Sequence, residues 1–263
     1  MKQVFGEFIE RTVEALERDP RFLGLAVAGS WVRDEIDEFS DLDLIIVCRD
    51  DAVTSPAAMR SVANELGSLI SSFTGEHVGE PTLLICLFEA DRLIHVDLKF
   101  VGRDGLEKRP YDPVVVWERE SSISDVLLRS TAAPVEPDRQ WIEDRFWTWV
   151  HYAALRIGRG ELFDLMSFLS FVREQVLGPM ALHAAGYPAH GVRKIERYLP
   201  DFARRLEATV PAYDRASGCR ATVATIEIYR ELRAAYPQRI IENERAERES
   251  MRFLEAVAAR TIP

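Results

Sequence analysis

The feature that most restricts the fold of this chain is a change of sequence pattern near residue 137. Before it, short apolar runs typical of strands alternate with helical patterns, and after it helical patterns follow one another with almost no strand signal. The change coincides with Ala133-Pro134-Val135-Glu136-Pro137, a stretch of the kind that joins domains. We therefore expect an α/β (α+β) fold. Residues 1–137 would form a domain with a small mixed sheet, and residues 138–263 an all-helical bundle.

Apolar periodicity predicts the individual elements of both domains. In the first, we expect a helix ending before Asp19, strands over 22–29 and 41–48, a helix over 56–73, a hairpin of strands 82–88 and 93–100, and an edge strand over 113–118. In the second, we expect helices over 141–158, 161–177, 221–236 and 243–261, with breaks at Gly158, Gly178, Gly186 and Pro188.

Composition and charge exclude several classes of protein. The 263-residue chain has a formal net charge of -10, so it lacks the basic surface of a DNA- or RNA-binding protein. We find no signal peptide, and no apolar run is long enough to cross a bilayer. The three cysteines are far apart in the sequence, which favours a reducing compartment. We expect a soluble, cytoplasmic protein with neither nucleic-acid nor membrane partners; whether it is a monomer or a homodimer stays open.

Three aspartates are the candidate catalytic residues. Asp41 and Asp43 begin the strand 41–48 and project from the same face, because successive strand residues alternate between faces. Two such carboxylates repel each other unless a cation neutralises them, and oxygen donors favour magnesium or manganese. Asp97 lies in the middle of the strand 93–100 among apolar residues. If the two strands are neighbours, the three carboxylates can hold two metal ions.

Gly29 and Ser30 predict a phosphate site beside these carboxylates. A strand that ends in glycine, followed by serine at the start of a helix, presents backbone N–H groups and a hydroxyl to an anion. Arg33, one helical turn beyond Ser30, could reach the same phosphates. Ser40 and Lys99 complete the candidate nucleotide-binding residues, and His95 shares the strand face of Asp97 and Lys99.

A plainer interpretation is that Asp41 and Asp43 cap and solubilise a strand, while Asp97 satisfies local hydrogen bonds. It leaves Asp97 poorly explained, because an aspartate among apolar strand residues is costly without a partner.

The pattern of Gly29-Ser30, a ten-residue gap, Asp41-x-Asp43 and a distant Asp97 resembles the DNA polymerase beta superfamily of nucleotidyltransferases. Within it, the chain looks like the aminoglycoside and lincosamide nucleotidyltransferases, in which a helical domain follows the catalytic core. The motifs cover roughly residues 20–100, whereas the helical half matches mainly in layout. The resemblance implies that Asp41 and Asp43 ligate magnesium, that Gly29 and Ser30 contact the triphosphate, and that Asp97 ligates metal or acts as base. Trp31 is bulkier than we expect at its position.

The predicted function is magnesium-dependent transfer of a nucleoside monophosphate, AMP from ATP in the first instance, to a hydroxyl of a small molecule such as an antibiotic. The general base would be Asp97 or a glutamate of the helical domain. Three alternatives remain open: a protein-modifying enzyme of the toxin–antitoxin type, a catalytically silent nucleotide-binding module, and an enzyme that extends tRNA or another polymer. The presence of all three carboxylates disfavours the second, and the acidic charge disfavours the third.

Overall fold

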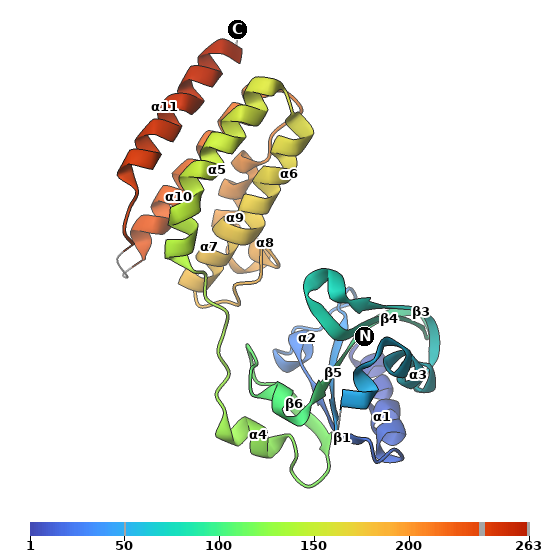
Figure 1. The fold of residues 1–263 in the computed structure, drawn as a ribbon. Coiled ribbons are helices and arrows are strands. Elements are labelled where there is room, and N and C mark those ends of the chain that lie inside the picture. Colours follow the sequence, from blue (N-terminus) through green and yellow to red (C-terminus); the bar gives the residue numbers. More distant parts are fainter. Residues whose placement is uncertain (50, 237–239, 262–263) are drawn as a thin grey trace. The chain divides into compact units, whose positions relative to one another are not determined.

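The computed structural model describes residues 1–49, 51–236 and 240–261 (Figure 1). Its contacts divide the chain into two units, Met1–Ala133 and Pro134–Pro263. This division falls at the start of the proline-rich stretch that carries the predicted boundary at residue 137. The first unit mixes helices with one sheet, and the second is helical, as the sequence predicts.

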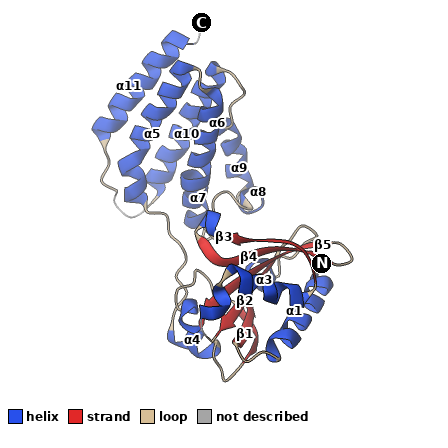
Figure 2. Ribbon diagram, turned by 45° about the vertical axis from the view of Figure 1, so that its right-hand side comes forward, coloured by secondary structure: helices blue, strands red, loops and turns tan. Residues whose placement is uncertain are grey.

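The first unit is built on a six-stranded mixed sheet with the order β3-β4-β5-β2-β1-β6. Its strands are drawn in red in Figure 2. β2 and β5 run parallel, whereas the other neighbouring pairs are antiparallel. The strands are β1 (Phe22–Val27), β2 (Leu42–Cys48), β3 (Ser68–Gly75), β4 (Glu80–Glu89), β5 (Leu93–Gly102) and β6 (Val114–Glu118). The predicted hairpin is β4 and β5, and the predicted edge strand is β6, which confirms both.

One prediction in this unit is wrong. Helix α3 (Pro56–Leu66) ends at Gly67, and the residues that we expected to continue it to Phe73 form strand β3 instead. The helical spacing of Leu69 and Ile70 is a local signal only. Pairing of β3 with β4 satisfies the backbone polar groups of both strands, and this long-range pairing decides the local structure.

One face of the sheet is covered by α1 (Lys2–Glu17) and α3. Apolar residues of both helices pack on alternate residues of the strands. This core includes Phe5, Phe8 and Leu16 of α1, Met59, Val62 and Leu66 of α3, Leu42, Leu44 and Ile46 of β2, Leu84, Cys86 and Phe88 of β4, and Val96, Leu98 and Phe100 of β5. Because strand residues alternate between faces, Asp43 and Asp97 lie on the opposite face.

That opposite face is covered over β1 and over the carboxyl ends of β2 and β5. Helix α4 (Ser124–Arg129) and the short helical turn Arg103–Leu106 contribute to this cover. Its buried core is Leu23, Ala26, Val47, Leu106, Ile123 and Val126. Asp43 lies four residues before Val47 on β2, on the same face of the sheet, and it therefore lies beyond the edge of this cluster.

The second unit contains α5 (Arg139–Arg159), α6 (Leu162–Val172), α7 (Gly178–Ala184), α8 (Ile195–Tyr198), α9 (Pro200–Leu206), α10 (Arg215–Ala235) and α11 (Glu244–Thr261). The predicted helices 141–158, 221–236 and 243–261 lie within or nearly coincide with α5, α10 and α11. Two predicted breaks are wrong. Gly158 lies inside α5, which ends at Gly160 with a φ of 75°. Gly178 continues a helical path through a π-helical turn, and a side chain there would collide with the Gly191 carbonyl.

A buried carboxylate, Glu143 of α5, ties this unit together. It accepts hydrogen bonds from Tyr229 Oη (2.5 Å) and Trp147 Nε1 (3.0 Å), and Arg233 of α10 lies 3.1 Å away. The Asn243 N–H, just before α11, also donates to it at 3.0 Å. The network therefore joins α5, α10 and the residue before α11 through one buried carboxylate.

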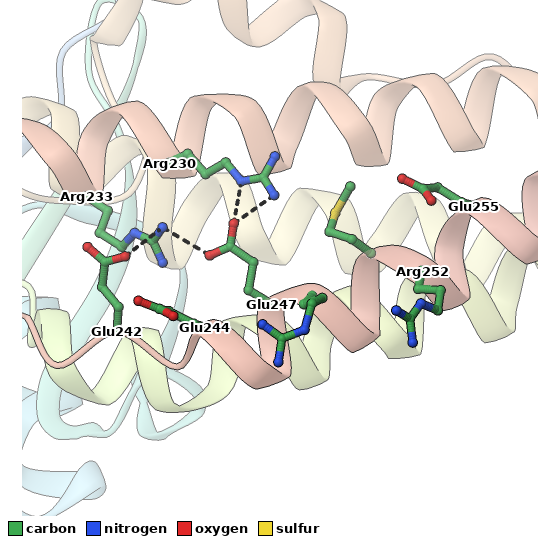
Figure 3. Close-up of a pocket in the computed structure, with 9 residues that line it drawn as sticks. Arg230, Arg233, Glu242, Glu244, Glu247, Arg252 and Glu255 are labelled. Atoms are coloured by element: carbon green, nitrogen blue, oxygen red, sulfur yellow. Dashed lines mark hydrogen bonds and ion pairs between the residues drawn. The ribbon is translucent and has the colours of Figure 1, made fainter.

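Between α10 and α11 lies a charged hollow of about 550 Å³ (Figure 3). Arg230 and Arg233 point from α10 toward Glu247 on α11, with N···O distances of 2.7 and 3.0 Å. Arg233 also pairs with Glu242 at 3.3 Å. These arginines are thus engaged by carboxylates of the same unit, and the hollow is lined by ion pairs that join α11 to α10.

Among the described helices, none combines the length and the apolar character needed to cross a membrane.

Candidate active site

Gly29 begins the short helix α2 (Gly29–Val32), which follows β1 after the single residue Ala28. Its φ of 64° lies in the left-handed region that favours glycine. A Cβ atom placed on Gly29 would overlap the carboxylate of Asp43. In addition, the Ala28 N–H donates to the Asp43 carbonyl oxygen at 3.0 Å. The turn is therefore held in direct contact with the strand that carries the candidate metal ligand, and only glycine fits there.

Ser30, the next residue, has an unusual hydroxyl. The residue is 6% exposed, and its Oγ has no hydrogen-bond partner, the one such buried side-chain atom in the part of the chain that the structure describes. A buried hydroxyl without a partner costs about 1–3 kcal/mol. The backbone N–H groups of the first helical turn also lack partners within a helix. The start of α2 thus offers donors to an anion beside Asp43.

Asp43 and Asp97 are brought together by the parallel pairing of β2 with β5. They are directly in register, so their side chains leave the same face of the sheet on adjacent strands, about 4.8 Å apart along the direction of pairing. Asp41 immediately precedes β2. It is half-buried, like Asp43 and Asp97. The neighbouring strands that the sequence analysis required are therefore present.

His95 contacts Asp97 within the same strand. Its Nε2 lies 3.1 Å from Asp97 Oδ1, with side-chain exposures of 50% for His95 and 22% for Asp97. The hydrogen bond with Asp97 raises the pKa of His95 above its ordinary value; burial opposes this, and the charges of Asp97, Asp41 and Asp43 add to the increase. The charges of all three carboxylates therefore act on the same imidazole.

The donor set of this cluster fits magnesium, although no complete metal cage is preformed. Across residues 1–49, 51–236 and 240–261, no three histidine, cysteine, aspartate or glutamate side chains converge in a metal-binding geometry. Magnesium is commonly held by one or two carboxylates together with water and substrate phosphates, rather than by an all-protein cage. Carboxylate oxygens beside an unpartnered buried hydroxyl agree with that type of site.

The remaining predicted nucleotide-binding residues make contacts within the chain. Ser40 Oγ accepts from the Asp37 N–H at 2.9 Å and donates to Asp37 Oδ1 at 2.9 Å, so it shapes the turn that leads into Asp41. Arg33 Nε lies 3.2 Å from Glu35 Oε2. Lys99 Nζ pairs with Glu80, and burial lowers the pKa of this lysine. The structure brings Gly29, Ser30, Asp43 and Asp97 together, whereas phosphate contacts by Arg33, Ser40 and Lys99 stay predictions.

The sequence predicts that His95 shares a strand face with Asp97, but it does not reveal the contact between them. Their spacing of two residues on one strand was the signal, since i and i+2 share a face. Glu80 was missed altogether. It lies at the start of β4, and only the pairing of β4 with β5 brings it to Lys99.

No family model and no curated protein matches this chain. Among solved structures, it is similar to an aminoglycoside 6-adenyltransferase from Bacillus subtilis, with 16% identity, 95% of this chain and 97% of that chain covered, and a TM-score of 0.42. It is also similar to a nucleotidyltransferase-like protein from Exiguobacterium sibiricum, with 11% identity, 92% and 84% covered, and a TM-score of 0.37. At these identities and TM-scores, we base the function on the side chains of the site.

Proposed function

We propose that this chain is a nucleotidyltransferase that moves a nucleoside monophosphate, AMP from ATP in the first instance, to a hydroxyl of a small molecule. One observation carries the proposal: the Gly29-Ser30 turn, with its unpartnered buried hydroxyl, is packed against Asp43, which is in register with Asp97. An anion-binding turn and a pair of carboxylates on one face are the parts that phosphoryl transfer needs.

The reaction forms one bond and breaks one. The acceptor oxygen bonds to the α-phosphorus of the nucleoside triphosphate, the bond from that phosphorus to the bridging oxygen breaks, and pyrophosphate leaves. Ser30 Oγ and the first backbone N–H groups of α2 would bind phosphate oxygens. Asp41, Asp43 and Asp97 would hold magnesium together with phosphate oxygens and water, and the metal would then supply charge neutralisation and lower the pKa of the attacking hydroxyl.

Asp97 is the residue that we propose to receive the acceptor proton. Its Oδ1 forms a hydrogen bond with His95, which fixes the orientation of the carboxyl group. Oδ2 would be the oxygen that receives the proton. A base must lie within hydrogen-bond reach of the hydroxyl that it deprotonates. The register of Asp97 with Asp43 brings it next to the proposed phosphate site, which supports this role.

The test is pyrophosphate release with magnesium, each of the four nucleoside triphosphates, and a panel of hydroxylated acceptors. We expect release that depends on both a nucleotide and an acceptor, and that falls at least about a thousandfold in Asp43→Asn. Asp201→Asn removes a carboxylate that is 88% exposed in the helical unit, and it should retain full activity. Failure of the wild-type protein to bind magnesium–ATP, or full activity of Asp43→Asn, would contradict the proposal.

A further inference from the structure

Phe39 has the largest exposed fraction of the described aromatic residues, 86%. A single exposed apolar side chain needs no explanation on a protein surface. What distinguishes Phe39 is its place, two residues before Asp41 in the loop that joins α2 to β2. Four residues of chain extend at most about 14 Å, so the backbone of Phe39 lies within that distance of Asp43. This is comparable to the length of a nucleotide.

The backbone around Phe39 is fixed by hydrogen bonds. A turn is closed where the Ser40 N–H donates to the Asp37 carbonyl oxygen at 3.4 Å. Asp37 Oδ1 accepts from the Phe39 N–H at 2.9 Å and from Ser40 Oγ at 2.9 Å. The guanidinium of Arg92, directly before β5, donates to the Glu38 carbonyl oxygen. The turn is thus attached to the amino end of β5, and it presents the aromatic ring to solvent on a fixed backbone.

The proposed reaction restricts where the nucleoside lies. In phosphoryl transfer, the attacking and leaving oxygens are roughly in line on opposite sides of the phosphorus. With pyrophosphate at Ser30, beyond the end of β1, and the acceptor hydroxyl at Asp97 on β5, this line crosses the strands. The nucleoside is bonded to the same phosphorus and therefore leaves at an angle to the line, so that it can extend along the strands.

Only one of the two directions along the strands is open. Toward the carboxyl ends of β2 and β5, the sheet face is covered by a core that includes Val47 and Leu106. Toward the amino ends, the face leads past Asp41 to the turn that carries Phe39. A nucleoside that follows the open direction therefore meets an exposed aromatic ring.

The charges beside Phe39 distinguish a base from a phosphate. Asp37 and Glu38 precede it directly, and Asp41 follows two residues later. Carboxylates repel a phosphate group. A nucleobase is uncharged and can stack on an aromatic ring. The turn is therefore suited to the base end of a nucleotide and not to its phosphates.

We propose that Phe39 stacks against the base of the nucleoside triphosphate. The assignment rests on the proposed function, because it takes Ser30 as the phosphate site and Asp97 as the position of the acceptor hydroxyl. Stacking on an aromatic ring tolerates every base, since each base has a π-face. Phe39 is thus a binding residue for all nucleotides that the protein accepts, and selection among bases belongs to other residues.

The first experiment measures binding without turnover. Titration calorimetry with magnesium compares ATP with inorganic tripolyphosphate, which lacks the nucleoside. Phe39→Ala should raise the Kd for ATP about tenfold or more, whereas Phe39→Tyr keeps the ring and should bind ATP like wild type. The Kd for tripolyphosphate should stay the same in both variants. The matched control is Leu128→Ala on α4, where the leucine is also 86% exposed and neither Kd should change.

The second experiment observes the ring directly. In protein with 4-fluorophenylalanine in place of Phe39 alone, the fluorine resonance should shift when ATP is added, because a stacked base changes the magnetic environment of the ring. Tripolyphosphate should not move it.

Each other outcome overturns the assignment. An ATP affinity that Phe39→Ala leaves unchanged, or a fluorine resonance that ATP does not move, refutes stacking and leaves the proposed function standing. An unchanged Kd for ATP with a raised acceptor KM would assign the ring to the acceptor instead. Equal losses of affinity for ATP and tripolyphosphate in Phe39→Ala would show a distorted phosphate site rather than a lost stacking contact. Wild-type protein that binds neither probe would sink the proposed function, and the role of Phe39 with it.

Discussion

Replacement of Ser30 by alanine is expected to stabilise the protein without nucleotide and to weaken nucleotide binding. Ser30 Oγ is buried and has no partner, so the protein bears the cost of removing this hydroxyl from water with no hydrogen bond in return. That cost is about 1–3 kcal/mol, and alanine avoids it. The small cavity left by the missing oxygen cancels part of this gain in stability. We expect Ser30→Ala to raise the free energy of unfolding by about 1 kcal/mol, or the melting temperature by about 3 °C.

The same substitution removes a donor from the proposed phosphate site. A hydrogen bond to a charged group contributes about 1.5–3 kcal/mol, so the Kd for magnesium–ATP should rise about 10- to 100-fold. Urea unfolding followed by tryptophan fluorescence measures the stability, and titration calorimetry measures the affinity. The two effects have opposite signs, and a merely structural serine would not produce that combination.

Ser122 provides the matched control. It is 3% exposed, but its Oγ donates to the Leu23 carbonyl at 2.8 Å. Ser122→Ala should therefore destabilise the protein by about 1 kcal/mol and leave the affinity for ATP unchanged. A loss of 1 kcal/mol or more in Ser30→Ala would refute the interpretation of an unpartnered hydroxyl. An ATP affinity within twofold of wild type would refute the assignment of Ser30 to the phosphate site.

Two further predictions concern the glycine turn and the buried glutamate. Gly29→Ala should abolish most pyrophosphate release, because its Cβ collides with Asp43. The control is Gly79→Ala, at a φ of 78° in open space, which should lower the free energy of unfolding by only roughly 1–2 kcal/mol and keep activity. Burial acts to raise the pKa of Glu143, but hydrogen bonds from Tyr229, the Asn243 N–H and Trp147 outweigh it, so the folded-state pKa lies below the ordinary value. The ionised Glu143 therefore stabilises the protein fully above its unfolded-state pKa of about 4.3, and this stabilisation is lost as the pH falls through the folded-state pKa. Urea titrations at several pH values should show this dependence in wild type but not in Glu143→Gln. At pH 7 that variant should be less stable by about 3–5 kcal/mol, whereas Glu249→Gln, at a carboxylate 52% exposed, should change little; equal stabilities would contradict the role of Glu143.

The sequence predicted those parts of the fold that depend on local pattern. Alternation placed Leu42 and Leu44 in the core and Asp43 on the other face, and the structure has this arrangement. Local pattern failed at residues 68–73, where helical spacing was overruled by pairing with β4. It also misread Gly178, whose role is close packing against Gly191 and not a helix break.

The candidate site was predictable in residue type but not in geometry. Gly29-Ser30 and the aspartates stand out because glycine at a strand end and carboxylates within a strand need an explanation. The register of Asp43 with Asp97 and the contact of Glu80 with Lys99 depend on which strands are neighbours. A sequence without its pairings does not contain that information. Strand β3 was missed for the same reason, since Phe73 was expected in a helix.

The register of β2 with β5 also restricts how a chain of this kind can change over evolution. Side chains alternate with a period of two, so inserting one residue within β5 before Asp97 would turn that aspartate into the core and expose an apolar neighbour. Insertions in the turn between β4 and β5, or in the loop before α3, would leave the phase of both strands untouched. We therefore expect relatives of this protein to differ freely in the length of the connections between the two aspartates, while the parity of each strand stays the same.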